Sequence, residues 1–205
     1  MTRLALALFF ALTIAHPLAA QRKADLDNQD RYDDTFRKYS KRFFGVGFDW
    51  HYFKAQGLAE SGLDPQARSP VGARGVMQLM PGTYALIKKA RSEGFGSIED
   101  PEWNIAAGIL YNRDLWQVWS DNPDEQERLR FMFGSYNAGP GTIRRATRVA
   151  KTRQLDDKTW RSVEEVAPAV QRWRYRETLP YVKKIEGNYR TLEEANRSKL
   201  VKKKK

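Results

Sequence analysis

The sequence contains no cysteine and only two histidines, His16 and His51. Without cysteine, the chain cannot form disulfides, a thiol nucleophile, a cysteine-based zinc site or a lipid link to a cysteine. Metal sites rich in histidine are excluded too, and we expect neither a metal nor a cofactor. A catalytic triad in the mature chain would depend on His51 alone.

Long apolar runs are also scarce. The run from Leu4 to Ile14 is shorter than the roughly 20 residues that span a bilayer. It follows Arg3 and precedes small residues suited to cleavage, which is the order found in secretory signals. We expect a signal peptide over residues 1–20, with a retained anchor as the alternative, then a polar lead-in over residues 21–30. Because a signal peptide directs export, we expect the protein to reside in the periplasm or cell envelope.

The chain shows no alternating β pattern, no internal repeat and no glycine-rich phosphate loop. We predict a single, mainly α-helical domain over residues 31–192, with loops between short helices and at most a vestigial β-hairpin. A basic tail, residues 193–205, is expected to be disordered. We expect a monomer.

The first two predicted helices rest on apolar spacing. Tyr32, Phe36, Tyr39 and Phe43 recur at spacings of four, three and four, and the glycines from Gly45 on end that helix. Asp49 is a candidate N-cap for the second helix. Trp50, Phe53 and Leu58 are expected to face inward along it, and Lys54 and Gln56 to face outward.

Capping signals place the later helices. One begins near Pro81, and another begins at Asp100-Pro101 and ends near Asn122-Pro123. Further helices are predicted over Glu125–Tyr136, over the basic segment Arg144–Arg153, and from about Thr178 to Leu192.

Acidic residues are in the minority, with 25 Asp and Glu against 36 Lys and Arg, a net charge of +11. This excess indicates a polyanionic partner or surface, either nucleic acid or an anionic cell-wall polymer. In the basic segment, Arg144, Arg148 and Lys151 recur at spacings of four and three. They form either a solvated helix face or a surface for the carboxylates of peptide stems in the wall.

Glu60 is the most informative carboxylate. It falls at the expected end of the second helix, beside a loop rich in glycine and proline. The helix dipole and apolar neighbours disfavour a negative charge there and raise the pKa of the carboxyl group. A raised pKa suits a proton donor near neutral pH. Taken alone, however, such a residue is usually a solvated surface glutamate.

Polar residues with two readings accompany Glu60. Ser69 and Gln78 lie on the following loop, and Met77 beside Gln78 is either a wall of the site or core filler. Tyr136 and Asn137, in "SYNAGPG", lie at a helix end, where they can project into a cleft or serve a glycine stop.

Four ordered segments resemble one family. They are "AESGLDPQARSPVGARGVMQLMPGT", "DPEWNIAAGILYNRDL", "FMFGSYNAGPGTI" and "RETLPYVKKI". Together they resemble the catalytic domain of the lytic transglycosylases, the goose-lysozyme-like muramidases of bacterial cell walls. The segment "YDDTFRKYSKRFFGVGFDW" is most similar to the membrane-bound F type. The resemblance implies a lysozyme-like helical domain with long active-site loops, acting on peptidoglycan glycan strands.

The resemblance also implies residue roles. Glu60 would be the single acid/base, cleaving the β-1,4 bond between N-acetylmuramic acid and N-acetylglucosamine and forming a 1,6-anhydromuramoyl end. The remaining implied positions would bind substrate: Ser69, Met77, Gln78, Tyr136, Asn137, Glu177 and Tyr181. For Glu177, an ion pair with a nearby arginine is equally well supported.

Three alternatives stay open. A goose-type muramidase would hydrolyse the same bond with water and a second carboxylate, with Asp64, Asp100 or Glu177 as candidates. A non-catalytic wall-binding protein would retain the fold alone. Nucleic-acid binding is supported only by the net charge. Because the sequence has a secretion signal and no recognition motif, we expect no nucleic-acid partner. The basic surface would instead favour peripheral contact with the wall or membrane.

Overall fold

The computed structural model describes residues 30–90 and 94–203. The chain divides into two compact units, Met1–Arg31 and Tyr32–Lys205. The predicted signal peptide and nearly all of the lead-in lie outside the described residues. Every helix described below belongs to the second unit.

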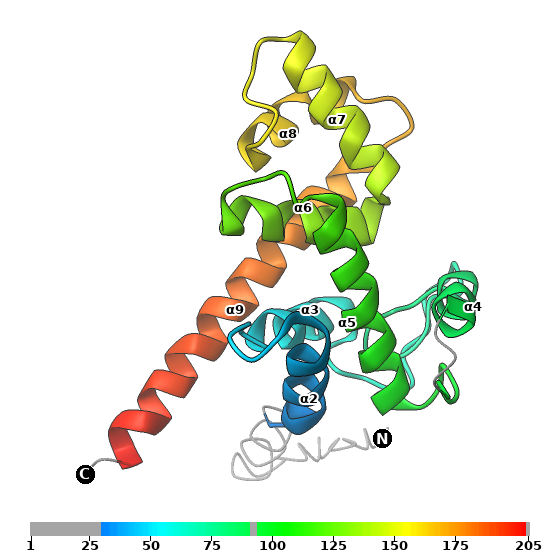
Figure 1. The fold of residues 1–205 in the computed structure, drawn as a ribbon, viewed down its shortest axis with the longest axis vertical. Helices are drawn as coiled ribbons and strands as arrows, with labels where there is room; N and C mark the ends of the chain where they lie inside the picture. The colour runs from blue at the N-terminus through cyan, green and yellow to red at the C-terminus, as the bar shows by residue number, and fades with distance from the viewer. Residues whose placement is uncertain (1–29, 91–93, 204–205) are drawn as a thin grey trace, which may run out of the picture. The chain divides into compact units, whose positions relative to one another are not determined.

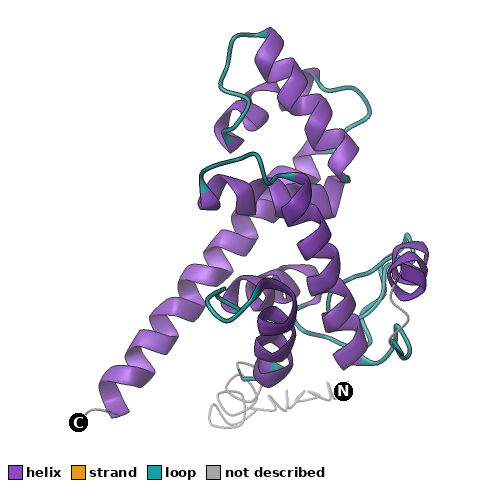
Figure 2. Ribbon diagram, viewed as in Figure 1, coloured by secondary structure: helices purple, strands orange, loops and turns teal. Residues whose placement is uncertain are grey.

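The described part of the second unit is built from eight α-helices and one 3-10 turn (Figures 1 and 2). They are α2 (Asp33–Phe44), α3 (His51–Ser61), α4 (Pro81–Ala90), α5 (Pro101–Val118), α6 (Glu125–Ala138), α7 (Pro140–Thr152), α8 (Trp160–Val166), η1 (Ala167–Ala169) and α9 (Tyr175–Lys203). Among these residues there is no strand, and two isolated β-bridges join Arg74 to Arg68 and Leu79. The mainly α prediction is confirmed.

Local sequence signals account for several helix ends. α2 turns Phe36 fully into the core and ends at Gly45, which has a φ of 101° that favours glycine. α5 begins at the predicted place, where the Asp100 carboxylate accepts a hydrogen bond from the Glu102 N–H at 2.8 Å. At the start of α3, the Asp49 carboxylate accepts from the His51 N–H at 3.0 Å. The N-cap residue of α3 is Trp50, so Asp49 bonds to the first turn from the position before the predicted cap.

Other helix limits differ from the predictions. α5 ends at Val118 rather than near Asn122, and α8 and η1 were not predicted. α9 starts at Tyr175 and continues through Lys203, so the described part of the predicted disordered tail is helical. A contact between Arg197 Nη2 and Glu193 Oε2, one turn apart at 3.2 Å, supports this extension.

Helix α3, which carries Glu60, packs mainly against α9 (Figure 1). Small residues on α3 let α9 approach its backbone. Asn188 Nδ2 donates to Ala55 O at 3.0 Å, and Lys184 Nζ donates to Ala59 O at 2.7 Å. The two helices are therefore joined by side chain to backbone bonds as well as by packing.

The prediction that Lys54 and Gln56 face solvent is wrong. Lys54 is 1% exposed and Gln56 is 0% exposed. α3 is covered by both α2 and α9, so its middle turns have no solvent face. Lys54 instead forms an ion pair with Asp33 of α2, and Gln56 bonds to side chains of α5 and α9. Both buried polar side chains, Lys54 and Gln56, thus have partners.

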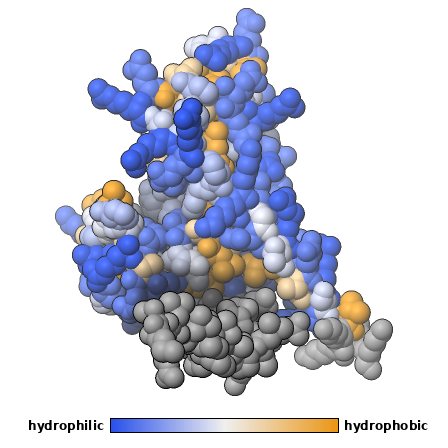
Figure 3. All heavy atoms as spheres, turned by 180° about the vertical axis from the view of Figure 1, so that it is seen from behind, coloured by the Kyte–Doolittle hydropathy of each residue, from blue (hydrophilic) through white to orange (hydrophobic). Residues whose placement is uncertain are grey.

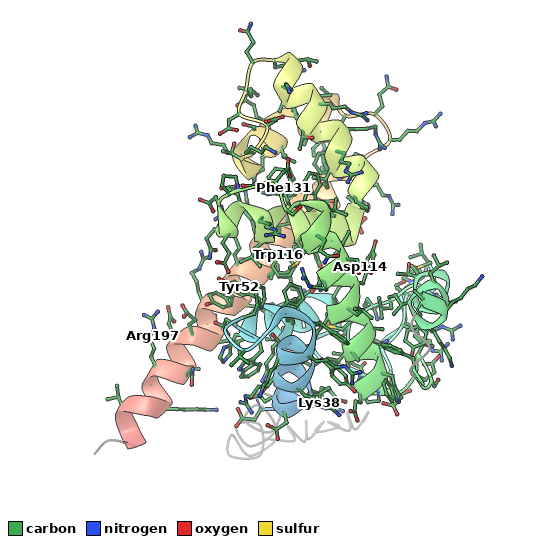
Figure 4. The ribbon with its side chains drawn as sticks, in the orientation of Figure 1. Lys38, Tyr52, Asp114, Trp116, Phe131 and Arg197 are labelled. Atoms are coloured by element: carbon green, nitrogen blue, oxygen red, sulfur yellow. The ribbon has the colours of Figure 1, made fainter. Side chains whose placement is uncertain are left out.

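Helices α2 and α5 also pack together. Lys38, labelled in Figure 4, donates from α2 to Glu102 Oε1 of α5 at 2.7 Å. Within residues 30–90 and 94–203, no helix combines the length and the apolar character of a membrane span.

Candidate active site

Glu60 lies in the last turn of α3, at the helix end where the sequence predicted it. Gly62 ends the helix with a φ of 66°, and its N–H donates to Leu58 O at 3.2 Å. The Glu60 side chain is half-buried. Its carboxyl group thus lies at the negative end of the helix and partly away from water, and both conditions disfavour its charged form.

The electrostatic environment raises the pKa of Glu60. Its pKa is raised from 4.5 to about 7, with burial as the largest cause. A hydrogen bond from Tyr181 and the positive charge of Lys184 lower it, and the negative charge of Glu177 raises it. A carboxyl group with a pKa near 7 is largely protonated just below neutral pH, so it can serve as a proton donor.

Tyr181 of α9 is the direct partner of Glu60. Its hydroxyl donates to Glu60 Oε1 at 2.6 Å. The same hydroxyl accepts a hydrogen bond from Gln56 Nε2 at 3.0 Å, and Gln56 Oε1 accepts from Asn112 Nδ2 at 2.6 Å. The sequence analysis placed Tyr181 at the site but missed Gln56 and Asn112. The signal for Gln56 is its place one helical turn before Glu60, between the small residues Ala55 and Gly57.

Tyr136 of α6 belongs to the same cluster. Its hydroxyl donates to Met77 O at 2.8 Å, and its ring lies 5.2 Å from that of Tyr111. Burial raises the pKa of Tyr136 well above its usual value, and the nearby charge of Glu60 adds to that rise. Tyr136 is therefore a neutral neighbour of Glu60, held in place by a backbone carbonyl.

The loop between α3 and α4 holds Ser69 and Gln78 in structural bonds. Ser69 Oγ accepts from the Ala73 N–H at 3.0 Å. Gln78 has a φ of 44°, and its Nε2 donates to Ala67 O at 3.1 Å and to Gly75 O at 2.9 Å. In the described residues these side chains shape the loop, and their predicted contacts with substrate remain predictions.

The expectation that the Met77 side chain contacts substrate does not fit its burial. Met77 is 0% exposed and packs against Gly108 of α5, where an added Cβ would lie 2.8 Å from Met77 Cβ. The buried Asn104 accepts from the Met77 N–H at 2.8 Å and donates to Arg74 O at 3.0 Å. Met77 therefore fixes the loop on α5, and its carbonyl orients Tyr136.

The remaining predicted residues, Asn137 and Glu177, lie at the end of α6 and at the start of α9. Asn137 Oδ1 accepts from Thr178 Oγ1 at 2.8 Å, which ties the end of α6 to α9. Glu177 is exposed and lies 3.5 Å from Arg174, also exposed, so this ion pair is worth little. The charge of Glu177 nevertheless reaches Glu60, because it raises the pKa of that residue.

Two surface hollows lie apart from Glu60. One hollow, between α3, α6 and α9, is lined by Tyr52 (labelled in Figure 4) and Tyr189 among others. Another, between the end of α5 and α7, is lined by Asp121 and Arg144 among others. Neither includes Glu60. In the part of the chain that the structure describes, no three His, Asp or Glu side chains gather as metal ligands would.

The family model of the Transglycosylase SLT domain matches residues 45–159 of the chain. Among curated proteins, the chain is 32% identical over 179 residues to membrane-bound lytic murein transglycosylase F of Shewanella pealeana, covering 82% of this chain and 35% of that protein. It is 34% identical over 145 residues to the protein of the same name from Vibrio cholerae, covering 71% and 25%. The chain thus spans about a third or less of these relatives.

Solved structures of lytic transglycosylases have a fold similar to that of this chain. The 70 kDa soluble lytic transglycosylase of Escherichia coli superposes with a TM-score of 0.59 at 29% identity, over 85% of this chain and 27% of that one. An inactive mutant of lytic transglycosylase Slt from Pseudomonas aeruginosa superposes with a TM-score of 0.66 at 24% identity, over 87% and 27%. The second likeness concerns the fold alone.

Proposed function

The chain belongs to the transglycosylase SLT domain family, a family of lytic transglycosylases, and from this premise we propose that it cleaves peptidoglycan. The bond cut is the β-1,4 bond between N-acetylmuramic acid and N-acetylglucosamine, and the product carries a 1,6-anhydromuramoyl end. One observation carries this proposal: Glu60 is a half-buried carboxyl group with a pKa of about 7, held by Tyr181. It has the properties of a single residue that gives and then takes a proton.

The reaction proceeds in two steps. Glu60 first gives its proton to the glycosidic oxygen as the bond from that oxygen to C1 breaks. The acetamido oxygen of the same sugar stabilises the positive charge at C1. The ionised Glu60 then takes the proton of the C6 hydroxyl, whose oxygen bonds to C1. Glu60 ends protonated, as it began, and no water is consumed.

The other residues of the site bind substrate in this proposal. Ser69, Gln78, Asn137 and Glu177 offer polar groups to the sugar hydroxyls and acetamido groups, alongside the loop and helix bonds they already make. Tyr136 contacts the ring of the sugar next to the bond that breaks. Tyr181 acts on Glu60 itself, because its hydroxyl is already bonded to that carboxyl group.

Hydrolysis by water is the second candidate, and Glu177 is the observation in its favour. A hydrolytic glycosidase uses two carboxyl groups about 5–9.5 Å apart. Asp100 caps α5 and Asp64 bonds its own turn, whereas the charge of Glu177 acts on Glu60. A non-catalytic wall-binding protein is the remaining alternative.

We also place the protein at the cell envelope. The relatives are named membrane-bound transglycosylases, and peptidoglycan is an envelope polymer. The N-terminal segment expected to be a secretory signal supports export.

Mass spectrometry of fragments released from purified peptidoglycan tests the proposal, with Glu60→Gln as the matched control. We expect anhydromuramoyl ends from the wild type and none from the variant. Reducing ends, one water heavier, would identify a hydrolase, and Glu177→Gln would then test the second carboxylate. Binding without release of fragments would leave a wall-binding protein.

A further inference from the structure

Four polar groups form an unbroken hydrogen-bonded chain from α5 to Glu60. Asn112 Nδ2 donates to Gln56 Oε1 at 2.6 Å, and Gln56 Nε2 donates to the Tyr181 hydroxyl at 3.0 Å. Tyr181 donates to Glu60 Oε1 at 2.6 Å. Gln56 and Asn112 are both 0% exposed, so bulk water does not compete for these bonds.

The direction of this chain is set at its far end, by the carbonyl group of Gly108. A carbonyl oxygen only accepts, and Asn112 Nδ2 lies 3.1 Å from Gly108 O. Asn112 must therefore present its NH2 group there, and the same group donates to Gln56, which must present its oxygen. Gln56 then offers its own NH2 group to Tyr181. The hydroxyl oxygen of Tyr181 accepts that bond, and its proton is directed at Glu60.

The inference rests on the proposed function. We propose that Gln56 and Asn112 are positioning residues, which keep Tyr181 donating to Oε1 of Glu60. The proton of neutral Glu60 then resides on Oε2, where it is available to the glycosidic oxygen. Without the donor of Gln56, the Tyr181 hydroxyl is free to rotate and to accept that proton, which would hold it away from the substrate.

Stability alone does not account for the buried pair. Asn112 Oδ1 is buried and has no hydrogen-bond partner in the described residues, and leaving such an atom unpaired costs about 1–3 kcal/mol. Replacing both members of a buried polar pair with apolar groups of similar size is often neutral or stabilising. A leucine pair at positions 56 and 112 would pack between α3 and α5 without an orphaned polar atom. The amides therefore have a use other than holding the helices together.

Several charged or titratable groups act on Glu60 and bear on any pH measurement. On α9 they are Tyr181, Lys184 and Glu177. On α6 the neighbour is Tyr136, which is coupled to the charge of Glu60. Gln56 and Asn112 do not titrate. A change in the pH profile of their variants therefore reports on Glu60 and its hydrogen bond with Tyr181.

A double-mutant cycle tests the proposal, using Gln56→Leu, Asn112→Leu and the double variant on a defined glycan substrate. We expect Gln56→Leu to lower kcat about tenfold, the order of one misdirected hydrogen bond, with KM changed less than twofold. Asn112→Leu should lower kcat several-fold in the wild-type background. When it is added to Gln56→Leu, it should not lower kcat further. The double variant should unfold at the wild-type temperature or above.

Asn122→Ala is the matched control for loss of a buried amide. Asn122 is also buried and donates to Lys158 O at 2.8 Å, away from Glu60. This variant should lose stability and keep its kcat. Independent, multiplying effects of Gln56→Leu and Asn112→Leu on kcat would overturn the proposal, as would a fall in kcat that simply follows the loss of stability.

An NMR titration of the Glu60 carboxyl carbon gives a readout that needs no activity. In Asn112→Leu the immediate surroundings of Glu60 are unchanged, yet Tyr181 can accept from neutral Glu60, so the pKa of Glu60 should rise above the wild-type value. An unchanged pKa would overturn the proposal even if the enzyme is active. If the wild type released no fragments, the proposed function would fail, and the titration would still decide the direction of the hydrogen bond.

Discussion

Two regions of the molecule use polar side chains in opposite ways. The base of the site, formed by α3, α5 and α9, links its buried amides to Tyr181 and Glu60 by hydrogen bonds. The cationic face of α7, defined here as Arg144, Arg148 and Lys151, is exposed, and in the described residues none of the three has a carboxylate within ion-pair distance. Hydrophilic side chains project from the end of the second unit that carries α7 and α8 (Figure 3).

The difference teaches where the identity of a polar residue matters. At the base of the site, a change of one atom from donor to acceptor alters where a proton lies. On α7, solvent screens each charge, and the three cations act together as a field with a range of about 8 Å at physiological salt. Equal changes in chemistry should therefore have unequal effects in the two regions.

The largest contrast should come from exchanging one charged group for an amide in each region. Glu60→Gln should lower activity at least about a thousandfold, because the amide cannot exchange the proton. Arg148→Gln should leave kcat within twofold. Fragment release from purified peptidoglycan measures both. Comparable losses in the two variants would remove the contrast.

The pH dependence of stability should differ between wild type and Glu60→Gln. The pKa of Glu60 is about 7 in the folded chain and near 4.5 when exposed. The stabilisation from its neutral form is complete below pH 4.5 and is lost as the pH rises through 7. The loss amounts to up to about 3 kcal/mol.

In Glu60→Gln the side chain does not titrate. The free energy of unfolding of this variant should therefore exceed that of the wild type by a margin that grows between pH 4.5 and 7. Urea denaturation at a series of pH values measures this gap. A constant gap would mean that Glu60 titrates normally.

A glycine in the core packs α6 against α8, outside both regions. Gly134 of α6 faces Trp160 of α8, and an added Cβ would lie 2.2 Å from Trp160 Cη2. Because both are buried, Gly134→Ala should lower the free energy of unfolding by about 2–3 kcal/mol. A Cβ added at Gly187 of α9 would meet open space, so Gly187→Ala should raise the free energy of unfolding by about 0.5–1 kcal/mol. Thermal or urea unfolding of the pair checks both signs, and similar results for the two would rule out the clash.

The same contrast explains what the sequence could predict. α7 is covered on one side only, so its buried residues, Ile143, Ala146 and Ala150, follow the period of a helix and its cations face solvent as the spacing indicates. α3 is covered by α2 and α9, so periodicity carries little information there. The outward prediction for Gln56 failed for this reason.

Local signals predicted the position of Glu60 better than they predicted the residues that support it. The Glu60 position and the cap at Asp100 depend on residues close in sequence, and both are found as expected. The bonds of Gln56 to Asn112 and Tyr181 join residues 56 and 125 positions apart. No short motif encodes such contacts, because they exist only once three helices have packed.

The smallest effect should come from removing the cationic face of α7. With Arg144, Arg148 and Lys151 all changed to glutamine, kcat should stay unchanged, because none of them contacts the base of the site. Binding to purified peptidoglycan should weaken a few-fold at low ionic strength, and the difference should fade by about 0.3 M salt, since screening shortens the range of exposed charges. Sedimentation of the protein with peptidoglycan at several salt concentrations measures this. A loss that persisted at high salt would mean that these cations make desolvated, geometrically defined contacts, and α7 would then resemble the base of the site.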